Sequence, residues 1–249
     1  MSINIGLFLI QITTGVDASR PSTASALLWG ADYAPLTFLA EPFRLFSSMF
    51  FHFGMIHLML NMWALYIFGS VAEQLFGRRY YIGLYLLSGL MGSLLSGYLD
   101  IQNSLQILQQ GNISAALLPR VSAGASGAVM GLGASLTLLS LLPVLRTQKF
   151  ILDKKTLLIM LVLNLFIGFM TAGINNAAHI GGMCMGAFLA LCWYLAEKYR
   201  LSWLRVTALI FAAVLCFALY QYCLALVDVL QPFWSELLHF MQIQRSESL

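Results

Sequence analysis

Four polar side chains stand inside long apolar stretches of the sequence and could together carry out acyl-transfer chemistry: His57, Asn61, Ser126 and His179. A serine hydroxyl is a poor nucleophile until a neighbouring base takes its proton, and histidine is the side chain with a suitable pKa. Ionisable residues are rare in spanning helices and are functional by default. We therefore expect Ser126 and His179 to form a nucleophile–base pair, and the lack of an acidic residue near His179 favours a dyad over a triad.

His57 and Asn61 are predicted to assist this pair. They are four residues apart, so they share one face of a helix. Tetrahedral acyl chemistry needs hydrogen-bond donors aimed at the developing oxyanion, and both side chains could supply them beside Ser126. Taken alone, Asn61 could equally be a hydrogen bond between helices, but the combination of hydroxyl, imidazole and amide favours chemistry.

Small residues flank both members of the predicted dyad. Gly124 and Gly127 would let a substrate backbone approach Ser126 closely. Gly182 and Gly186, four residues apart, would let the helix of the histidine press against that of the serine. By itself, such a run of small residues also suits plain helix packing.

The composition excludes a soluble domain, because 60% of the 249 residues are hydrophobic and only 9% are charged, against about 25% in soluble proteins. A net charge of +3 without a basic tail gives no reason to expect nucleic acid as a partner. The four cysteines lack the spacing of a zinc site, and we expect neither a metal nor a cofactor.

Six apolar runs have about the length of a spanning helix, roughly 20 residues, and they predict an all-α, polytopic membrane helical bundle. These runs are Gly54–Phe76, Tyr80–Leu99, Ala123–Leu145, Thr156–Ala172, Ala177–Leu195 and Leu201–Leu226. A further run, Ile3–Ile12, has only half that length. It is either a short, tilted first span or, as we favour, the end of a helix that starts upstream of Met1.

Lysine and arginine accumulate on the cytoplasmic side of membrane proteins, and here they cluster on every second connection. The clusters lie at 78–79, 146–155 and 198–205. Segments 15–53, 100–122 and 171–176 and the C-terminal tail are therefore expected outside the cytoplasm. All four polar residues then follow the outer start of a span, in one shallow layer roughly 5–10 Å below the outer boundary at about 1.5 Å per residue.

These residues resemble the motifs of the rhomboid family of intramembrane proteases between about Leu36 and Ala190. The family's Gly-x-Ser-Gly motif is matched by Gly124-Ala125-Ser126-Gly127, and its His-x-x-x-Asn motif by His57 and Asn61. Ala178, His179, Gly182 and Gly186 match its Ala-His-x-x-Gly-x-x-x-Gly motif, and Glu41-Pro42-Phe43-Arg44 resembles its outer-loop signature. One departure is Met130, where many members carry an aromatic residue against the histidine.

The resemblance implies that Ser126 is the nucleophile and His179 the general base. It further implies that the Ser126 backbone N–H, His57 and Asn61 form the oxyanion hole. Residues 1–197 would be a six-helix catalytic core with a partly embedded outer loop at 15–53. Residues 198–249 would add one transmembrane helix and a tail, and the span at 156–172 would border a lateral substrate gate.

The predicted function is an intramembrane serine protease that hydrolyses peptide bonds in or near the transmembrane segments of membrane-protein substrates. It would lie in the lipid bilayer of a bacterial inner membrane, with its active site facing the extracytoplasmic side. Two alternatives stay open: a non-catalytic rhomboid-like protein that binds membrane clients, and a small transporter. The substrate and the oligomeric state are left open.

Overall fold

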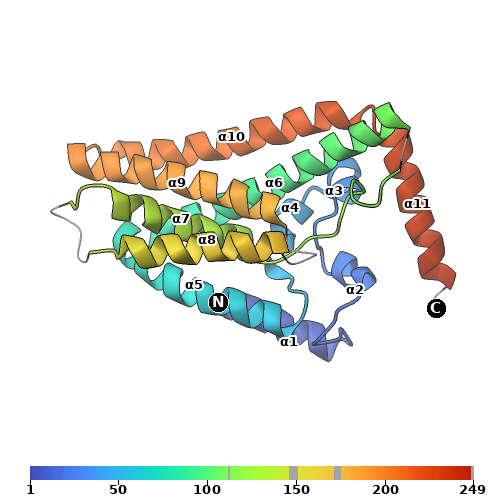
Figure 1. Cartoon of the computed structure of the whole chain (residues 1–249), viewed down its shortest axis with the longest axis horizontal. Helices are drawn as coiled ribbons and strands as arrows, with labels where there is room; N and C mark the ends of the chain where they lie inside the picture. Colours follow the sequence, from blue (N-terminus) through green and yellow to red (C-terminus); the bar gives the residue numbers. More distant parts are fainter. Residues whose placement is uncertain (112, 146–150, 171–174, 248–249) are drawn as a thin grey trace.

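The structure, a computed structural model, describes residues 1–111, 113–145, 151–170 and 175–247, and all regular elements within them are helical (Figure 1). The long helices are α1 (Ser2–Thr13), α5 (Met55–Phe76), α6 (Arg78–Gln110), α7 (Ser126–Leu141), α8 (Lys154–Met170), α9 (Asn176–Tyr199), α10 (Trp203–Val227) and α11 (Gln231–Glu247). Four short helices connect α1 to α5: α2 (Thr23–Leu28), α3 (Ala34–Leu39), α4 (Arg44–Ser47) and the 3-10 turn η1 (Ser48–Phe50).

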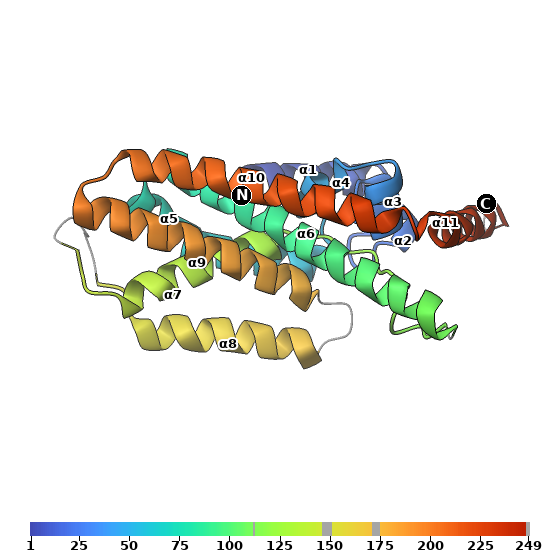
Figure 2. The ribbon, with the colours of Figure 1, turned by 90° about the horizontal axis from the view of Figure 1, so that it is seen from above.

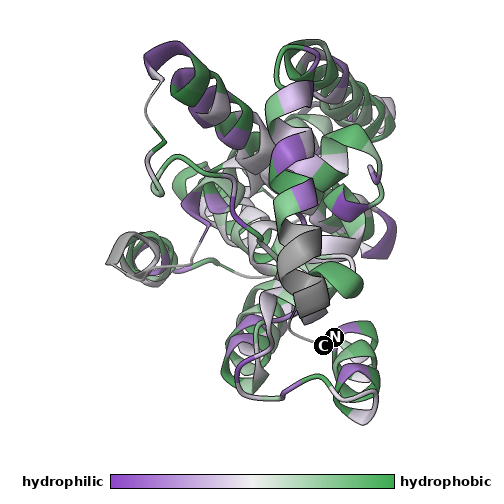
Figure 3. Ribbon diagram, turned by 90° about the vertical axis from the view of Figure 1, so that its right-hand side faces the viewer, coloured by the Kyte–Doolittle hydropathy of each residue, from purple (hydrophilic) through white to green (hydrophobic). Residues whose placement is uncertain are grey.

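The helices form a bundle around α7, which is packed against α5, α6, α8 and α9. Figures 1 and 2 show α10 lying along the outside of this group, where it packs on α6 and α9. Four described helices are long and apolar enough to cross a membrane, namely α5, α6, α9 and α10 with its preceding residue. Figure 3 shows hydrophobic residues along the helices of the bundle, with hydrophilic ones between them. The predicted all-α bundle of a multi-pass membrane protein is confirmed.

The central helix α7 is shorter than its predicted span at 123–145. Its 16 residues give about 24 Å at 1.5 Å per residue, less than the roughly 30 Å of a bilayer core. Residues Ser122–Ala125 approach it as irregular chain that pairs with the outer loop. Ser126, the first residue of α7, therefore starts the helix inside the bundle.

Helix α6 is longer than its predicted span at 80–99 and corrects the expected outer segment 100–122, because the helix continues to Gln110. Its 33 residues give about 50 Å of helix. In the extension Ile101, Ser104 and Ile107 are buried, and their spacing of three puts them on one face. A period of this kind escapes a search for long apolar runs.

That inner face of α6 meets the C-terminal helix α11, which sequence reasoning treated only as a tail. Trp234 of α11 has no exposed surface, and its indole N–H donates to Ser104 Oγ over 3.0 Å. Figure 1 shows α11 running across the end of the bundle. In Figure 3 α11 faces the viewer and mixes hydrophilic with hydrophobic residues, as expected of a helix at a membrane surface.

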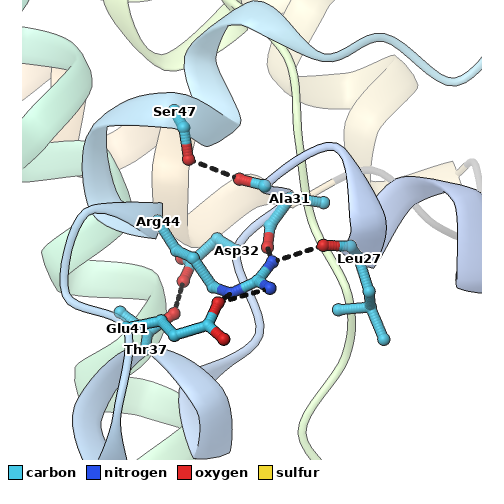
Figure 4. Close-up of polar contacts among 8 residues, drawn as sticks. Leu27, Ala31, Asp32, Thr37, Glu41, Arg44 and Ser47 are labelled. Atoms are coloured by element: carbon cyan, nitrogen blue, oxygen red, sulfur yellow. Dashed lines mark hydrogen bonds and ion pairs between the residues drawn. The ribbon is translucent and has the colours of Figure 1, made fainter. Parts of the chain in front are cut away.

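The outer loop 15–53 is held together by Arg44 (Figure 4). Its guanidinium donates to the Leu27 and Ala31 carbonyls over 2.8 Å each and pairs with the Glu41 carboxylate over 2.6 Å. Only 6% of Arg44 is exposed, so these partners replace the water that its charge has lost. The Glu41–Arg44 signature thus fixes the loop and lies apart from Ser126.

Candidate active site

The structure brings Ser126 and His179 together from two helices. Ser126 Oγ lies 2.9 Å from His179 Nε2, within hydrogen-bond distance, although 53 residues separate them in the chain. Ser126 is the first residue of α7, and His179 lies in the first turn of α9. His179 is 7% exposed and Ser126 is partly buried. The pair therefore sits inside the bundle near one end of both helices.

Glycines bring α7 and α9 into backbone contact beside this pair. A Cβ atom at Gly182 would lie 2.0 Å from the Gly127 carbonyl oxygen, and one at Gly186 would lie 2.1 Å from that of Gly131. No side chain fits at such distances, because the opposing atoms belong to backbone. The small residues around the predicted dyad therefore set the distance between its two helices.

The start of α9 is tied to α6 as well. Asn175 caps α9 by accepting the Ala178 N–H over 3.0 Å, and its Nδ2 donates to Ser96 Oγ of α6 over 2.5 Å. A Cβ atom at Gly92 of α6 would lie 2.5 Å from the Ala178 oxygen. These contacts fix the turn that carries His179, and sequence reasoning did not single out Asn175 or Ser96.

His57 presents one ring nitrogen toward the serine segment. Its Nδ1 accepts the Phe53 backbone N–H over 3.2 Å, so the neutral ring carries its hydrogen on Nε2. A Cβ atom at Gly124 would lie 2.9 Å from His57 Nε2. Glycine at this position, where φ is +131°, therefore leaves that N–H edge uncovered.

Asn61 lies one turn further along α5 and is 6% exposed. Its Nδ2 donates one hydrogen to the His57 carbonyl over 2.9 Å. A side-chain amide has two hydrogens, so a second one is available. The first backbone N–H groups of α7 are available too, because the first intrahelical bond runs from Val129 N–H to the Ala125 carbonyl.

The chain before Ser126 is held in place by the outer loop. Ser122 and Asp32 exchange two backbone hydrogen bonds of 2.8 Å, and the Gly124 N–H donates to the Ser48 carbonyl over 2.9 Å. The pairing of Asp32 with Ser122 joins residues about 90 positions apart, and no motif in the sequence predicts it. It fixes the approach of the chain to α7 and thereby the direction of the serine.

His52 also supports the chain that leads to Ser126. It is fully buried, and its Nε2 accepts the Ala125 N–H over 3.4 Å. Its ring meets that of His57 edge to face, with centroids 5.3 Å apart. Burial, with His57 beside it, lowers the pKa of His52 to about 3, so the ring is neutral at ordinary pH and can accept. The sequence offers two signals for His52, its nearness to His57 and the Phe51-His52 pair that follows the outer-loop signature at Glu41–Arg44.

Among the described residues, two ion pairs are present, Glu41–Arg44 and Arg205–Glu197, and neither involves a histidine. No group of three metal-ligating side chains gathers within the described part of the chain. The arrangement around Ser126 therefore offers a hydroxyl, an imidazole and several N–H donors, which are the parts needed for acyl transfer.

Comparison with known proteins gives a match between residues 39–196 and the family model described as Rhomboid domain. The chain is 36% identical over 184 residues to RHOMBOID-like protein 5 of Arabidopsis thaliana, covering 72% of this chain and 53% of the relative. It is 30% identical to the Rhomboid protease AarA of Providencia stuartii, covering 88% of this chain and 80% of the relative. Identity to the Rhomboid protease GluP of Bacillus subtilis is also 30%, over 74% of this chain and 31% of the relative.

Proposed function

Because the chain belongs to the rhomboid family, we propose that it is an intramembrane serine protease that cleaves other membrane proteins in or near their transmembrane segments. The observation that carries the proposal is the 2.9 Å contact between Ser126 Oγ and His179 Nε2 inside a membrane bundle. Two relatives that resemble the chain along most of its length bear the name protease. The chain spans about half of RHOMBOID-like protein 5 and about a third of GluP.

In the proposed reaction His179 acts as general base and then as general acid. Its Nε2 takes the hydroxyl proton as Ser126 Oγ attacks the scissile carbonyl carbon, and it gives that proton to the departing amine. An ester then joins the substrate to Ser126. Water attacks the ester after losing a proton to His179, and the substrate leaves with a new carboxyl terminus while Ser126 regains its proton.

The oxyanion of each tetrahedral intermediate would be bound by three donors. They are the Ser126 backbone N–H, the Nε2–H of His57 and the second amide hydrogen of Asn61. The Phe53 N–H supports this role for His57, because it occupies Nδ1 and leaves the donor on the other side of the ring. Donors fixed before the reaction stabilise the charge without reorganisation.

We infer a dyad rather than a triad, because within the described residues no carboxylate lies within ion-pair distance of His179. The packing of α9 takes over the orienting task that an aspartate has in a triad. The Asn175 cap and the glycine contacts with α7 hold the histidine turn at the serine.

The active site would face the extracytoplasmic side of the membrane. Positive residues at 78–79, 154–155 and 198–205 lie at the other end of the helices, as the positive-inside rule requires. Water would reach Ser126 from the outer face, past the outer loop. A bacterial inner membrane is the proposed location, and fluorescence of a fused reporter in bacterial cells would test it.

Substrates would enter beside α8, which stands apart at the edge of the bundle in Figure 2. Met130 and Ala134 of α7 form a small apolar cluster with Leu161 of α8. A small seam separates more easily than a large one, so α8 is suited to border a lateral gate. Residues 1–197 would act as the catalytic core, with 198–249 packed against it as an addition.

The test is cleavage of a model transmembrane substrate by the purified full chain in liposomes. Ser126→Ala is expected to abolish cleavage, whereas Ser140→Ala is the matched control. Ser140 lies on the same helix and donates only to the Thr137 carbonyl, so its variant is expected to keep the wild-type rate. Unchanged cleavage by Ser126→Ala would refute the proposal.

A serine-reactive fluorophosphonate separates this function from its alternatives. The protease predicts labelling that disappears in both Ser126→Ala and His179→Ala. A protein that only binds membrane clients, or a transporter, has no activated serine and predicts no labelling of the wild type.

A further inference from the structure

A basic cavity lies at the end of the bundle away from Ser126, between the turn from α5 to α6 and the start of α10. Its volume is about 450 Å³, and Arg78, Arg79 and Arg205 line it. His57 near the start of α5 is 19 residues from Phe76 at its end, so the cavity lies roughly 30 Å from the candidate active site by helix rise. It plays no part in the proposed reaction.

The arginines that line the cavity outnumber the carboxylates that pair with them. Arg205 pairs with Glu197 over 3.2 Å and remains 39% exposed at its side chain. In the described part of the chain, neither Arg78 nor Arg79 has a carboxylate within 4.0 Å. Two of the three guanidinium groups are therefore free to bind an anion. Arginine matches phosphate well, because its planar fork can donate two parallel hydrogen bonds.

Two helices begin at the rim of the same cavity. Gly77 precedes α6 and Ser202 precedes α10, both residues line the cavity, and neither helix has a side-chain cap. The first backbone N–H groups of a helix lack intrahelical acceptors and lie at the positive end of its dipole. They add donors of the kind that bind phosphate to the charge of the arginines.

The remaining wall is apolar and continues to the outside of the bundle. Val206 and Leu209 of α10 line the cavity, and Val206 is 60% exposed. Trp203 and Tyr199 nearby on the chain are also 60% exposed, as is typical of aromatic residues at a membrane–water interface. The cavity thus joins positively charged side chains to an apolar wall, and the exposed aromatic residues beside it lead us to expect it at the depth of lipid headgroups.

We propose that this cavity binds an anionic glycerophospholipid, with its phosphate at Arg78, Arg79 and Arg205 and an acyl chain along Val206 and Leu209. Basic pockets between transmembrane helices bind such headgroups in other membrane proteins. The lipid would bridge the starts of α6 and α10. Neither helix start depends on Ser126 or His179, so the proposal stands apart from the proposed protease function.

The test is native mass spectrometry of the full chain in detergent, titrated with dioleoyl phosphatidylglycerol or with neutral dioleoyl phosphatidylcholine. We expect one phosphatidylglycerol to bind at least tenfold more tightly than phosphatidylcholine. Arg78→Gln with Arg79→Gln is expected to weaken phosphatidylglycerol binding about 30-fold, at about 1 kcal/mol for each basic residue. If this double variant fails to fold, Arg78→Gln alone should give about a fivefold loss.

The matched control is Lys154→Gln with Lys155→Gln, which removes the same charge from exposed positions at the start of α8, at the same end of the bundle. It is expected to change binding less than twofold. An equal loss in both double variants would overturn the proposal, because binding would then follow net charge alone. Equal binding of phosphatidylcholine would also overturn it, as would displacement of the lipid by inorganic phosphate at the same concentration.

Discussion

Gly182 of α9 faces the carbonyl oxygen of Gly127 of α7 so closely that a Cβ atom on Gly182 would lie 2.0 Å from it. The contact lies within one helical turn of both Ser126 and His179. The geometry of the candidate dyad therefore depends on the lack of a side chain at Gly182, and this can be tested by adding one methyl group there.

Gly182→Ala is expected to lower both stability and cleavage, because α9 must move away from α7. Overpacking costs about 1–3 kcal/mol, and a displacement of about 1 Å at a catalytic group costs roughly 100-fold in rate. The thermal midpoint in detergent and the cleavage rate measure the two effects. Gly6→Ala is the control, since a Cβ there has no neighbour within 4 Å. A wild-type rate for Gly182→Ala would contradict the role given to this contact.

His57→Ala is expected to lower kcat by about 10²–10³ and to leave KM nearly unchanged, because an oxyanion donor acts on the transition state. Steady-state kinetics with a model transmembrane substrate would measure both constants. His239→Ala, at an exposed position on α11, is expected to behave as the wild type. A rise in KM at constant kcat would instead indicate that His57 serves substrate binding.

Asp32→Asn is expected to change how stability depends on pH. Burial raises the pKa of Asp32 to about 6, against 3.8 ordinarily, so the folded state favours the protonated carboxyl. The stability that this group contributes is present below pH 4 and is lost as pH rises through 6, by about 3 kcal/mol. The variant lacks this pH-dependent loss of stability, so its thermal midpoint should rise relative to that of the wild type between pH 4 and pH 7.5.

Asp17, whose pKa is lowered instead of raised, is the control for the same pH series. Backbone N–H groups of Arg20 and Ser19 and the Ser19 hydroxyl lower the pKa of Asp17 to about 2. It is therefore ionised in both the folded and the unfolded state over most of that range. The difference in thermal midpoint between Asp17→Asn and the wild type should stay constant with pH. A constant difference for Asp32→Asn as well would contradict the raised pKa of Asp32.

Trp234→Phe is expected to loosen α11 from α6 by removing one buried hydrogen bond, that to Ser104, at about 1 kcal/mol. Trp234→Ala removes the packing too and is expected to cost about 3–5 kcal/mol. Protease protection of the C-terminal segment measures the docking. Trp203→Phe, at a residue that is 60% exposed, should have almost no effect. Equal protection of all three variants would argue against the contact.

The residues of the candidate site could be picked out from the sequence, because each is a polar group in an apolar surrounding. The spacing of His57 and Asn61 placed them on one helix face, and the charged connections placed Ser126 and His179 at one depth. The structure brings the last two within 2.9 Å. The distance itself depends on Gly127 and Gly182 meeting across two helices, which spacing along one chain cannot specify.

The supports of the site were less accessible to sequence reasoning. The pairing of Asp32 with Ser122 consists of backbone hydrogen bonds, which any two residues can form. The extension of α6 and the docking of α11 depend on the contact of Ser104 with Trp234 between two mixed polar and apolar helices. A search for apolar runs detects helices that face lipid, but it misses mixed polar and apolar helices that pack against each other.

The shortness of α7 also bears on how the protein would respond to membranes of different thickness. Every residue of α7 from Gly127 to Thr137 is buried, so lipid tails would contact outer helices such as α5, α9 and α10 instead. A thicker or thinner bilayer can tilt those outer helices at modest cost. The depth of Ser126 is then fixed by the neighbouring helices and not by the local lipid, so the proposed protease would cut at a constant position along substrates in membranes of different thickness.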